Sequence, residues 1–135
     1  MSNIDKFSFA ASKIMVELYD SFPVPINLNV RQLNSELSEA FDEELQHNIN
    51  VYRHTFHFLK REGFVVNDNK EVRDSHVFRG SVLTVKGLAT LNKVPDTLKD
   101  KSAATFAEQL QEVKSKGLML AGNAGLNAIV RAIFS

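Results

Sequence analysis

The sequence contains no cysteine, which excludes disulfide bonds and metal sites built on thiolates. A chain without cysteines suits a reducing compartment, and we expect a cytoplasmic protein. The first residues, MSNIDKFSF, contain no basic cluster followed by an apolar run, so no secretory signal peptide is expected. Long apolar runs are lacking too. The most apolar stretch, GLMLAGNAGLNAIVRAIF, is interrupted by Asn123, Asn127 and Arg131, and a membrane span is therefore not predicted.

An excess of charge of either sign is also missing, since 16 Lys and Arg residues balance 16 Asp and Glu residues. A dedicated nucleic-acid-binding protein is usually basic, because phosphate contacts supply most of its affinity. Residues 63–93 hold the one clear basic surplus, with five basic and three acidic side chains. This is the segment whose charge most favours contact with nucleic acid.

Catalytic and phosphate-binding motifs are absent as well. The stretch GLMLAGNAG contains glycines, but it follows no predicted strand and lacks the Gly-Lys-Ser/Thr sequence of a phosphate loop. Serines 81, 102 and 115 have no His–Asp arrangement near them in the sequence. The sequence therefore predicts neither an enzyme nor a bound cofactor.

What the chain does contain is a series of amphipathic helical patterns. The 135 residues, 44% hydrophobic and 24% charged, are typical of a globular protein with its own core. Helices are predicted over residues 4–21, after Asn29, from Asp42 to about residue 62, over 102–116 and at the C-terminus. The most regular pattern repeats at steps of three and four and comprises Leu45, Ile49, Tyr52, Phe56 and Leu59. Four residues are predicted N-caps: Asn29, Asp42, Thr84 (for a short helix ending before Pro95) and Ser102.

The stretch FHFLKREGFVV changes from a helical to a strand-like pattern at Gly63. Glycine after a helix end allows the positive φ that the reversal requires. FVV and HVFRGSVLT are both rich in β-forming residues, and the turn-rich stretch between them predicts an antiparallel hairpin with a loop of nearly ten residues. We therefore predict a mainly α fold with a small antiparallel β-hairpin.

The residues on both sides of this hairpin resemble a pattern found in many bacterial winged helix-turn-helix proteins. The matching positions are Leu59, Gly63, Phe64, Leu83, Thr84, Gly87 and Leu91. The chain is also similar to small uncharacterised winged-helix proteins of bacteria and phages that add C-terminal helices. The resemblance implies a winged helix-turn-helix domain over residues 1–95 and a helical extension over 96–135 that serves in packing or dimerisation. It implies a transcriptional regulator or a phage-type accessory protein.

In winged-helix DNA-binding proteins the third helix enters the major groove and the hairpin contacts phosphate or the minor groove. The corresponding DNA-binding candidates are Gln46, His47, Asn50, Arg53, His54, His57, Lys70, Arg73 and Arg79. Gln46, Asn50 and Arg53 can read base edges, and the basic residues of the hairpin can reach phosphates. Carboxylates at residues 42–44, however, would repel phosphate. The alternative is a winged-helix protein–protein interaction module that does not bind DNA.

Three histidines of the predicted third helix raise the question of a metal site. His54 and His57 can meet on one face, but His47 lies about 10 Å from His54 along the helix axis. No cysteine or suitably spaced carboxylate completes the site, so we predict no metal and interpret these residues as surface or partly buried histidines.

The apolar residues near the C-terminus have two interpretations. They can pack on the first helix of their own chain, or they can form a homodimer interface. The dimer-interface candidates are Met119, Leu120, Leu126, Ile129, Ile133 and Phe134. Met119 and Leu120 favour the dimer, because this end then holds more apolar surface than a monomer needs.

Overall fold

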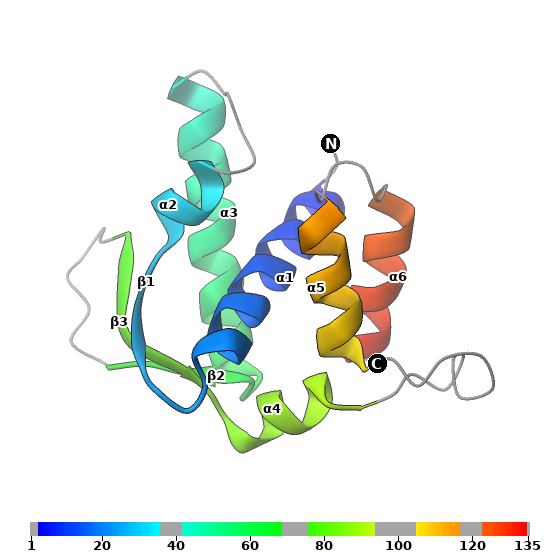
Figure 1. Ribbon diagram of the computed structural model, residues 1–135. Coiled ribbons are helices and arrows are strands. Elements are labelled where there is room, and N and C mark those ends of the chain that lie inside the picture. Colours follow the sequence, from blue (N-terminus) through cyan, green and yellow to red (C-terminus); the bar gives the residue numbers. More distant parts are fainter. Residues whose placement is uncertain (1–2, 36–41, 69–75, 94–104, 117–122, 135) are drawn as a thin grey trace.

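The computed structural model combines helices with one small antiparallel sheet (Figure 1), which confirms the predicted mainly α class with a small β component. It describes residues 3–35, 42–68, 76–93, 105–116 and 123–134, without the side chains of residues 34–35, 42–46, 113–116 and 123–127. The elements are α1 (Asn3–Ser21), β1 (Ile26–Asn29), α2 (Val30–Ser35), α3 (Asp42–Arg61), β2 (Val65–Val66), β3 (Val77–Leu83), α4 (Val85–Leu91), α5 (Phe106–Lys116) and α6 (Asn123–Phe134).

The sheet contains the predicted hairpin and one strand that was not predicted. Its order is β1-β3-β2, and β2 pairs antiparallel with β3 so that Val65 lies opposite Leu83. β1 pairs antiparallel with the other side of β3. The sequence analysis predicted no strand between the first two helices. The alternation of Ile26 and Leu28 with two asparagines in β1 is the period-two signal that would have indicated a strand.

A bulge bends β3 where it passes β1. Ile26 lies opposite Ser81 and Leu28 opposite Phe78, so β3 has one more residue than β1 over this interval. Gly80 takes up the extra residue with φ +65, a conformation that glycine adopts without steric cost. The Gly80 N–H donates to Asn27 Oδ1 at 3.3 Å, which ties the bulge to the edge strand.

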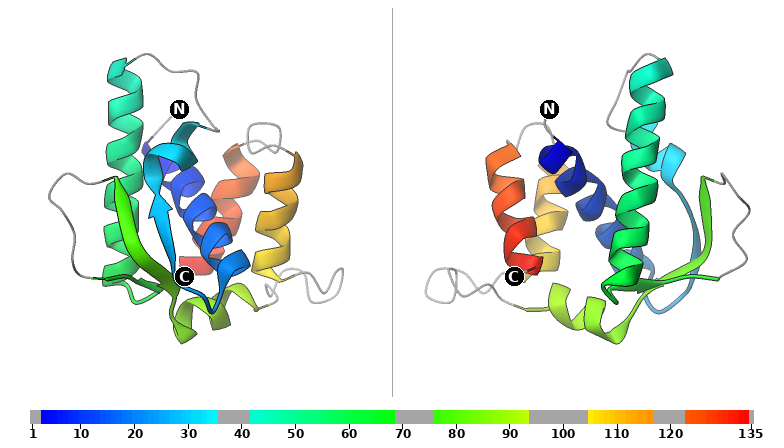
Figure 2. Two further views of the ribbon diagram at one scale, coloured as in Figure 1. Left: turned by 60° about the vertical axis from the view of Figure 1, so that its left-hand side comes forward. Right: turned by 180° about the vertical axis from the view of Figure 1, so that it is seen from behind.

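The central element is α1, which the other elements surround (Figure 2). Ile14 and Val16 are two residues apart, so their side chains leave the helix about 200° apart, on nearly opposite sides. Both are buried, so α1 is covered on both of these sides. α3 and β3 cover one part of α1, and α5 and α6 cover another. Leu110 of α5 and Val130 of α6 belong to the same buried cluster as the α1 side chains. The two C-terminal helices therefore share the core of the preceding elements.

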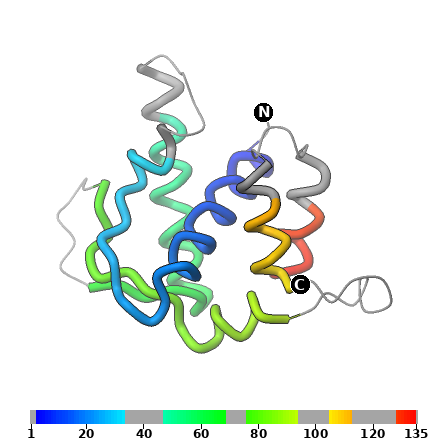
Figure 3. Tube along the Cα trace, in the orientation of Figure 1, coloured from blue at the N-terminus to red at the C-terminus, as the bar shows by residue number. Residues whose placement is uncertain are grey.

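The chain reverses sharply between α3 and β2 (Figure 3), as the sequence predicted. Gly63 has φ +84, its N–H donates to the Lys60 carbonyl at 3.1 Å, and the Phe64 N–H donates to the Leu59 carbonyl at 2.9 Å. This pair of bonds is a Schellman motif, which satisfies carbonyl groups at the helix end. The prediction of a glycine-terminated helix leading directly into a strand is confirmed.

The start of α4 packs tightly on this junction. The Thr84 N–H donates to the Phe64 carbonyl at 3.0 Å, and the Thr84 hydroxyl donates to the Gly63 carbonyl. A Cβ atom on Gly87 would lie 2.2 Å from the Phe64 carbonyl oxygen, so no larger residue fits without a shift. Packing explains the residue pattern around this junction, since Leu59, Leu83 and Leu91 of that pattern are also buried.

The predicted N-caps have mixed outcomes. Asn29 Oδ1 accepts from the Gln32 N–H at 3.2 Å and Thr84 Oγ1 from the Gly87 N–H at 3.0 Å, which confirms both. The helix predicted from Ser102 begins only at Phe106, and Ser102 lies outside the described residues. Thr105 caps this helix, because its hydroxyl accepts from the Glu108 N–H at 3.1 Å and its own N–H donates to the Glu108 carboxylate at 3.3 Å.

One predicted helix end also differs. The helix α4 ends at Leu91 rather than continuing to the residue before Pro95, and Asn92 is its C-cap. The helix α6 begins at Asn123 and includes Gly125. A glycine within a helix costs only about 1 kcal/mol relative to alanine, so the packing of Val130 and Ile133 can retain it.

Candidate nucleic-acid interface

One face of α3 packs against the core, and a different face carries the predicted DNA-binding residues. Ile49, Tyr52, Phe56 and Leu59 are buried. His47, His54 and His57 are exposed, and Asn50 and Arg53 are half-buried. At 100° per residue, these last five side chains lie within about 120° of the helix circumference. We call them the outer face of α3. Gln46 belongs to α3, but its side chain is not described.

The outer face of α3 lies next to the hairpin. The ring of Phe78 on β3 stacks on Phe56 with centroids 4.0 Å apart, and the His57 ring meets the same Phe78 edge-on at 5.4 Å. Arg79 follows Phe78 on β3 and is exposed. These contacts place strand β3 of the hairpin beside the helix face that carries Asn50 and Arg53. Lys70 and Arg73, the other hairpin candidates, lie outside the described residues.

Two further cations lie at the C-terminal end of α3. Arg61 is exposed at the end of α3, with its guanidinium 5.6 Å from the centre of the Phe58 ring. Lys86 donates to the Glu62 carbonyl at 2.7 Å and its ammonium lies 4.7 Å from the centre of the Phe64 ring. Both cations lie at the helix end next to the hairpin.

Arg53 also contributes to the packing of α3. Its Nε atom is buried, although the residue as a whole is half-exposed. The aliphatic part of such an arginine packs against its neighbours, so its removal changes packing as well as charge. Arg79 is exposed and is therefore the cleaner residue with which to test phosphate contact.

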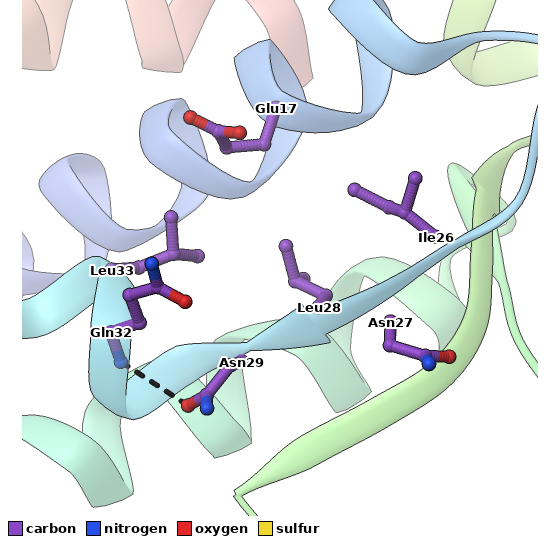
Figure 4. Close-up of a pocket in the computed structure, with 7 residues that line it drawn as sticks. All are labelled: Glu17, Ile26, Asn27, Leu28, Asn29, Gln32 and Leu33. Carbon is purple, nitrogen blue, oxygen red and sulfur yellow. Dashed lines mark hydrogen bonds between the residues drawn. The ribbon is translucent and has the colours of Figure 1, made fainter.

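A pocket of about 130 Å³ lies between α1, β1 and α2 (Figure 4). It is lined by Glu17 of α1, by all four residues of β1, and by Gln32 and Leu33 of α2. Leu28 and Leu33 are buried, Glu17 is half-buried, and Gln32 is exposed. No candidate from the sequence lies in this pocket, because it depends on a strand that was not predicted.

Some of the C-terminal candidates for a dimer interface pack against other residues of their own chain. Ile133 is buried and Ile129 is half-buried. The Phe134 ring lies 5.9, 5.7 and 5.2 Å from the rings of Phe7, Phe58 and Phe64. These contacts agree with the first interpretation, packing on the first helix. Met119 and Leu120 lie outside the described residues, and the side chain of Leu126 is not described.

The described residues also bear on two other kinds of site. Among these residues, no group of three or more His, Cys, Asp or Glu side chains is placed to hold a metal ion. None of the helices, as far as the structure describes them, combines the length and the apolar composition needed to cross a membrane.

Comparisons with known proteins give no relative: no family model, no curated protein and no solved structure matches this chain. The function is therefore inferred from the arrangement of α3 and the hairpin.

Proposed function

We propose that this chain is a cytoplasmic winged helix-turn-helix protein that binds double-stranded DNA without catalysing a reaction, as a transcriptional regulator or a phage-type accessory protein. The order of elements supports this proposal, because α1, α2 and the long α3 are followed directly by the β2–β3 hairpin. The pairing of β1 with β3 adds a third strand to that hairpin. The pattern from Leu59 to Leu91 supports it further.

The observation that carries the proposal is the outer face of α3 next to β3, a strand of the hairpin that also carries the exposed Arg79. An α-helix fits the major groove, where asparagine pairs with adenine and arginine with guanine. Asn50 and Arg53 supply these two chemistries on one side of the helix. In this mechanism residues 46–57 enter the groove and residues 70–79 of the hairpin contact the backbone.

A salt titration with a mixed-sequence DNA duplex tests the proposal. We expect log Kd to rise linearly with log salt concentration, because phosphate contacts release counterions. Arg79→Ala should weaken binding and lower the slope by about 0.9, the value for one phosphate contact. Arg131→Ala is the matched control, since it removes the same charge from an exposed position on α6. Equal effects of the two changes would show that the hairpin does not contact DNA.

The rival function is a protein-interaction module, and the charge of the chain favours it. The formal net charge is zero, and acidic residues occupy positions 42–44 at the start of α3. If the protein shows no retention on DNA even at low salt, the rival becomes the better interpretation. Homodimerisation stays a prediction, which sedimentation of the full chain at increasing concentration can test. A chain shortened at Lys116 would be unsuitable, because it lacks the core residues Val130 and Ile133.

A further inference from the structure

We propose that pH regulates the DNA affinity of the outer face of α3, because protonation of His47, His54 and His57 adds positive charge where the duplex contacts the helix. The inference rests on the proposed function and concerns the control of the same site. Three of the four histidines of the chain lie on this face, and all three are exposed. Arg53 is the one permanently charged residue among the five of the outer face, so the histidines decide how positive this face becomes.

The three histidines form a row along the helix rather than a cluster at one end. The ten residues from His47 to His57 correspond to about 15 Å along the helix axis. Duplex DNA carries one phosphate charge for about every 1.7 Å of its own axis, so a helix of this length in a groove lies close to several phosphates. Each histidine can therefore meet a different phosphate.

The chemistry of histidine gives the direction of the effect. Histidine is the side chain whose ordinary change of charge falls between about pH 5 and pH 8. The neutral ring donates from one nitrogen, whereas the protonated ring donates from both and carries a positive charge. Because the protonated form binds phosphate more tightly, proton binding and DNA binding strengthen each other. The DNA affinity therefore rises as the pH falls through this range and is lost as the pH rises through it.

The described surroundings of the outer face leave this charge available to DNA. The elements α1, α2, β2 and β3 pack against α3. The described side chains of α2, α3, β2 and β3 include no carboxylate. Their charged members besides Arg53 are Arg31, Lys60, Arg61 and Arg79, and the fourth histidine, His76, comes directly before β3. The charge that the histidines gain is therefore not neutralised by any described side chain of these four elements.

The carboxylates near α3 lie in other places. α1 packs against the core side of α3, since Ile14 and Ile49 belong to one buried cluster. The charged residues of α1 are Asp5, Lys6, Lys13, Glu17 and Asp20. Asp68 follows β2, where its N–H donates to the Arg79 carbonyl at 2.8 Å, and Glu62 follows the end of α3. Residues 42–44 are acidic, but their side chains are not described. The described acidic side chains around α3 therefore lie on α1 or beyond the ends of α3 and β2.

The test is the affinity for one mixed-sequence duplex, measured from about pH 8 to about pH 5.5 at constant ionic strength. We expect binding to tighten about tenfold over this range, the effect of one hydrogen bond to a charged group. The slope of log Kd against log salt concentration should also become steeper by up to about 2.7, since each histidine that neutralises a phosphate contributes about 0.9.

Three variants assign the effect to these histidines. The triple variant His47→Gln, His54→Gln, His57→Gln should bind with no pH dependence, because glutamine does not titrate. The corresponding triple lysine variant should bind tightly at both ends of the range, because lysine stays charged throughout. His76→Gln is the matched control, since His76 is half-buried and outside the outer face, and this variant should keep the pH dependence. Circular dichroism at both ends of the range establishes that every variant is folded.

The possible failures distinguish this inference from the proposed function. If the original protein binds DNA with an affinity that does not change with pH, the regulation is refuted and DNA binding stands. Retention of the pH dependence by the triple glutamine variant, or its loss in His76→Gln, would assign the effect to other groups and likewise overturn the inference. Absence of binding at every pH, even at low salt, would refute the proposed function and this inference with it.

Discussion

At the scale of single residues, two glycines decide how α3, the hairpin and α4 join. The backbone of Gly63 has φ +84, a value that residues other than glycine rarely adopt. Gly87 is required for a different reason, since its missing side chain lets α4 approach the Phe64 carbonyl. The sequence allowed the role of Gly63 to be predicted, because a glycine after a helical pattern has a local meaning. The role of Gly87 became visible only with the contact across the junction.

Gly87→Ala should destabilise the protein by about 1–3 kcal/mol, because the new Cβ overlaps a backbone oxygen that cannot move independently of β2. Urea unfolding monitored by circular dichroism measures this change. Val85→Ala in the same helix is the control, since Val85 is 81% exposed and its truncation should alter stability by no more than about 0.5 kcal/mol. A Gly87→Ala protein as stable as the original would contradict the close packing of α4 on the junction.

At the scale of elements, the helices were predicted more accurately in their inward faces than in their boundaries. The spacing of Ile49, Tyr52 and Phe56 identified the buried side of α3, and all three are buried. The start of α5 was placed too early, because Ser102 was chosen as the cap and the reciprocal pair Thr105–Glu108 was overlooked. That pair is a Thr-x-x-Glu capping box and was readable in the sequence.

Thr105→Ala should reduce the free energy of unfolding by about 1 kcal/mol, because the Glu108 N–H loses its acceptor and the helix loses its cap. Ser102→Ala is the natural comparison and should change stability by no more than about 0.5 kcal/mol. Thermal and urea unfolding of the two variants measure the difference. The reverse order of effects would show that Ser102 is the functional cap after all.

At the scale of the whole molecule, α5 and α6 complete the core around α1. Phe106, Leu110, Val130 and Ile133 are all buried in one cluster with the side chains of α1. The predicted division into residues 1–95 and 96–135 separates segments that share this cluster. We therefore expect the described elements to unfold as one cooperative unit.

Ile133→Ala should cost about 2–4 kcal/mol, because it leaves a cavity in this shared core. The loss should appear in a single transition when unfolding is followed both by circular dichroism and by NMR signals of the α3–β3 region. Arg131→Ala, in the same helix and exposed, serves as the control. Separate transitions for α6 and for the α3–β3 region would indicate that the C-terminal helices fold independently.

Features that depend on neighbours a few residues away could be predicted from the sequence alone. These are the buried faces of the helices, the caps at Asn29 and Thr84, and the reversal at Gly63, since each uses hydrogen bonds or contacts within about one turn. The tertiary structure decided the rest. β1 becomes a strand by pairing with residues about 50 positions later, α5 and α6 bury the far side of α1, and the pocket at Glu17 exists only where three separate elements meet. The alternation in β1 is a local sign of a strand, but neither segment alone indicates which distant segment it contacts.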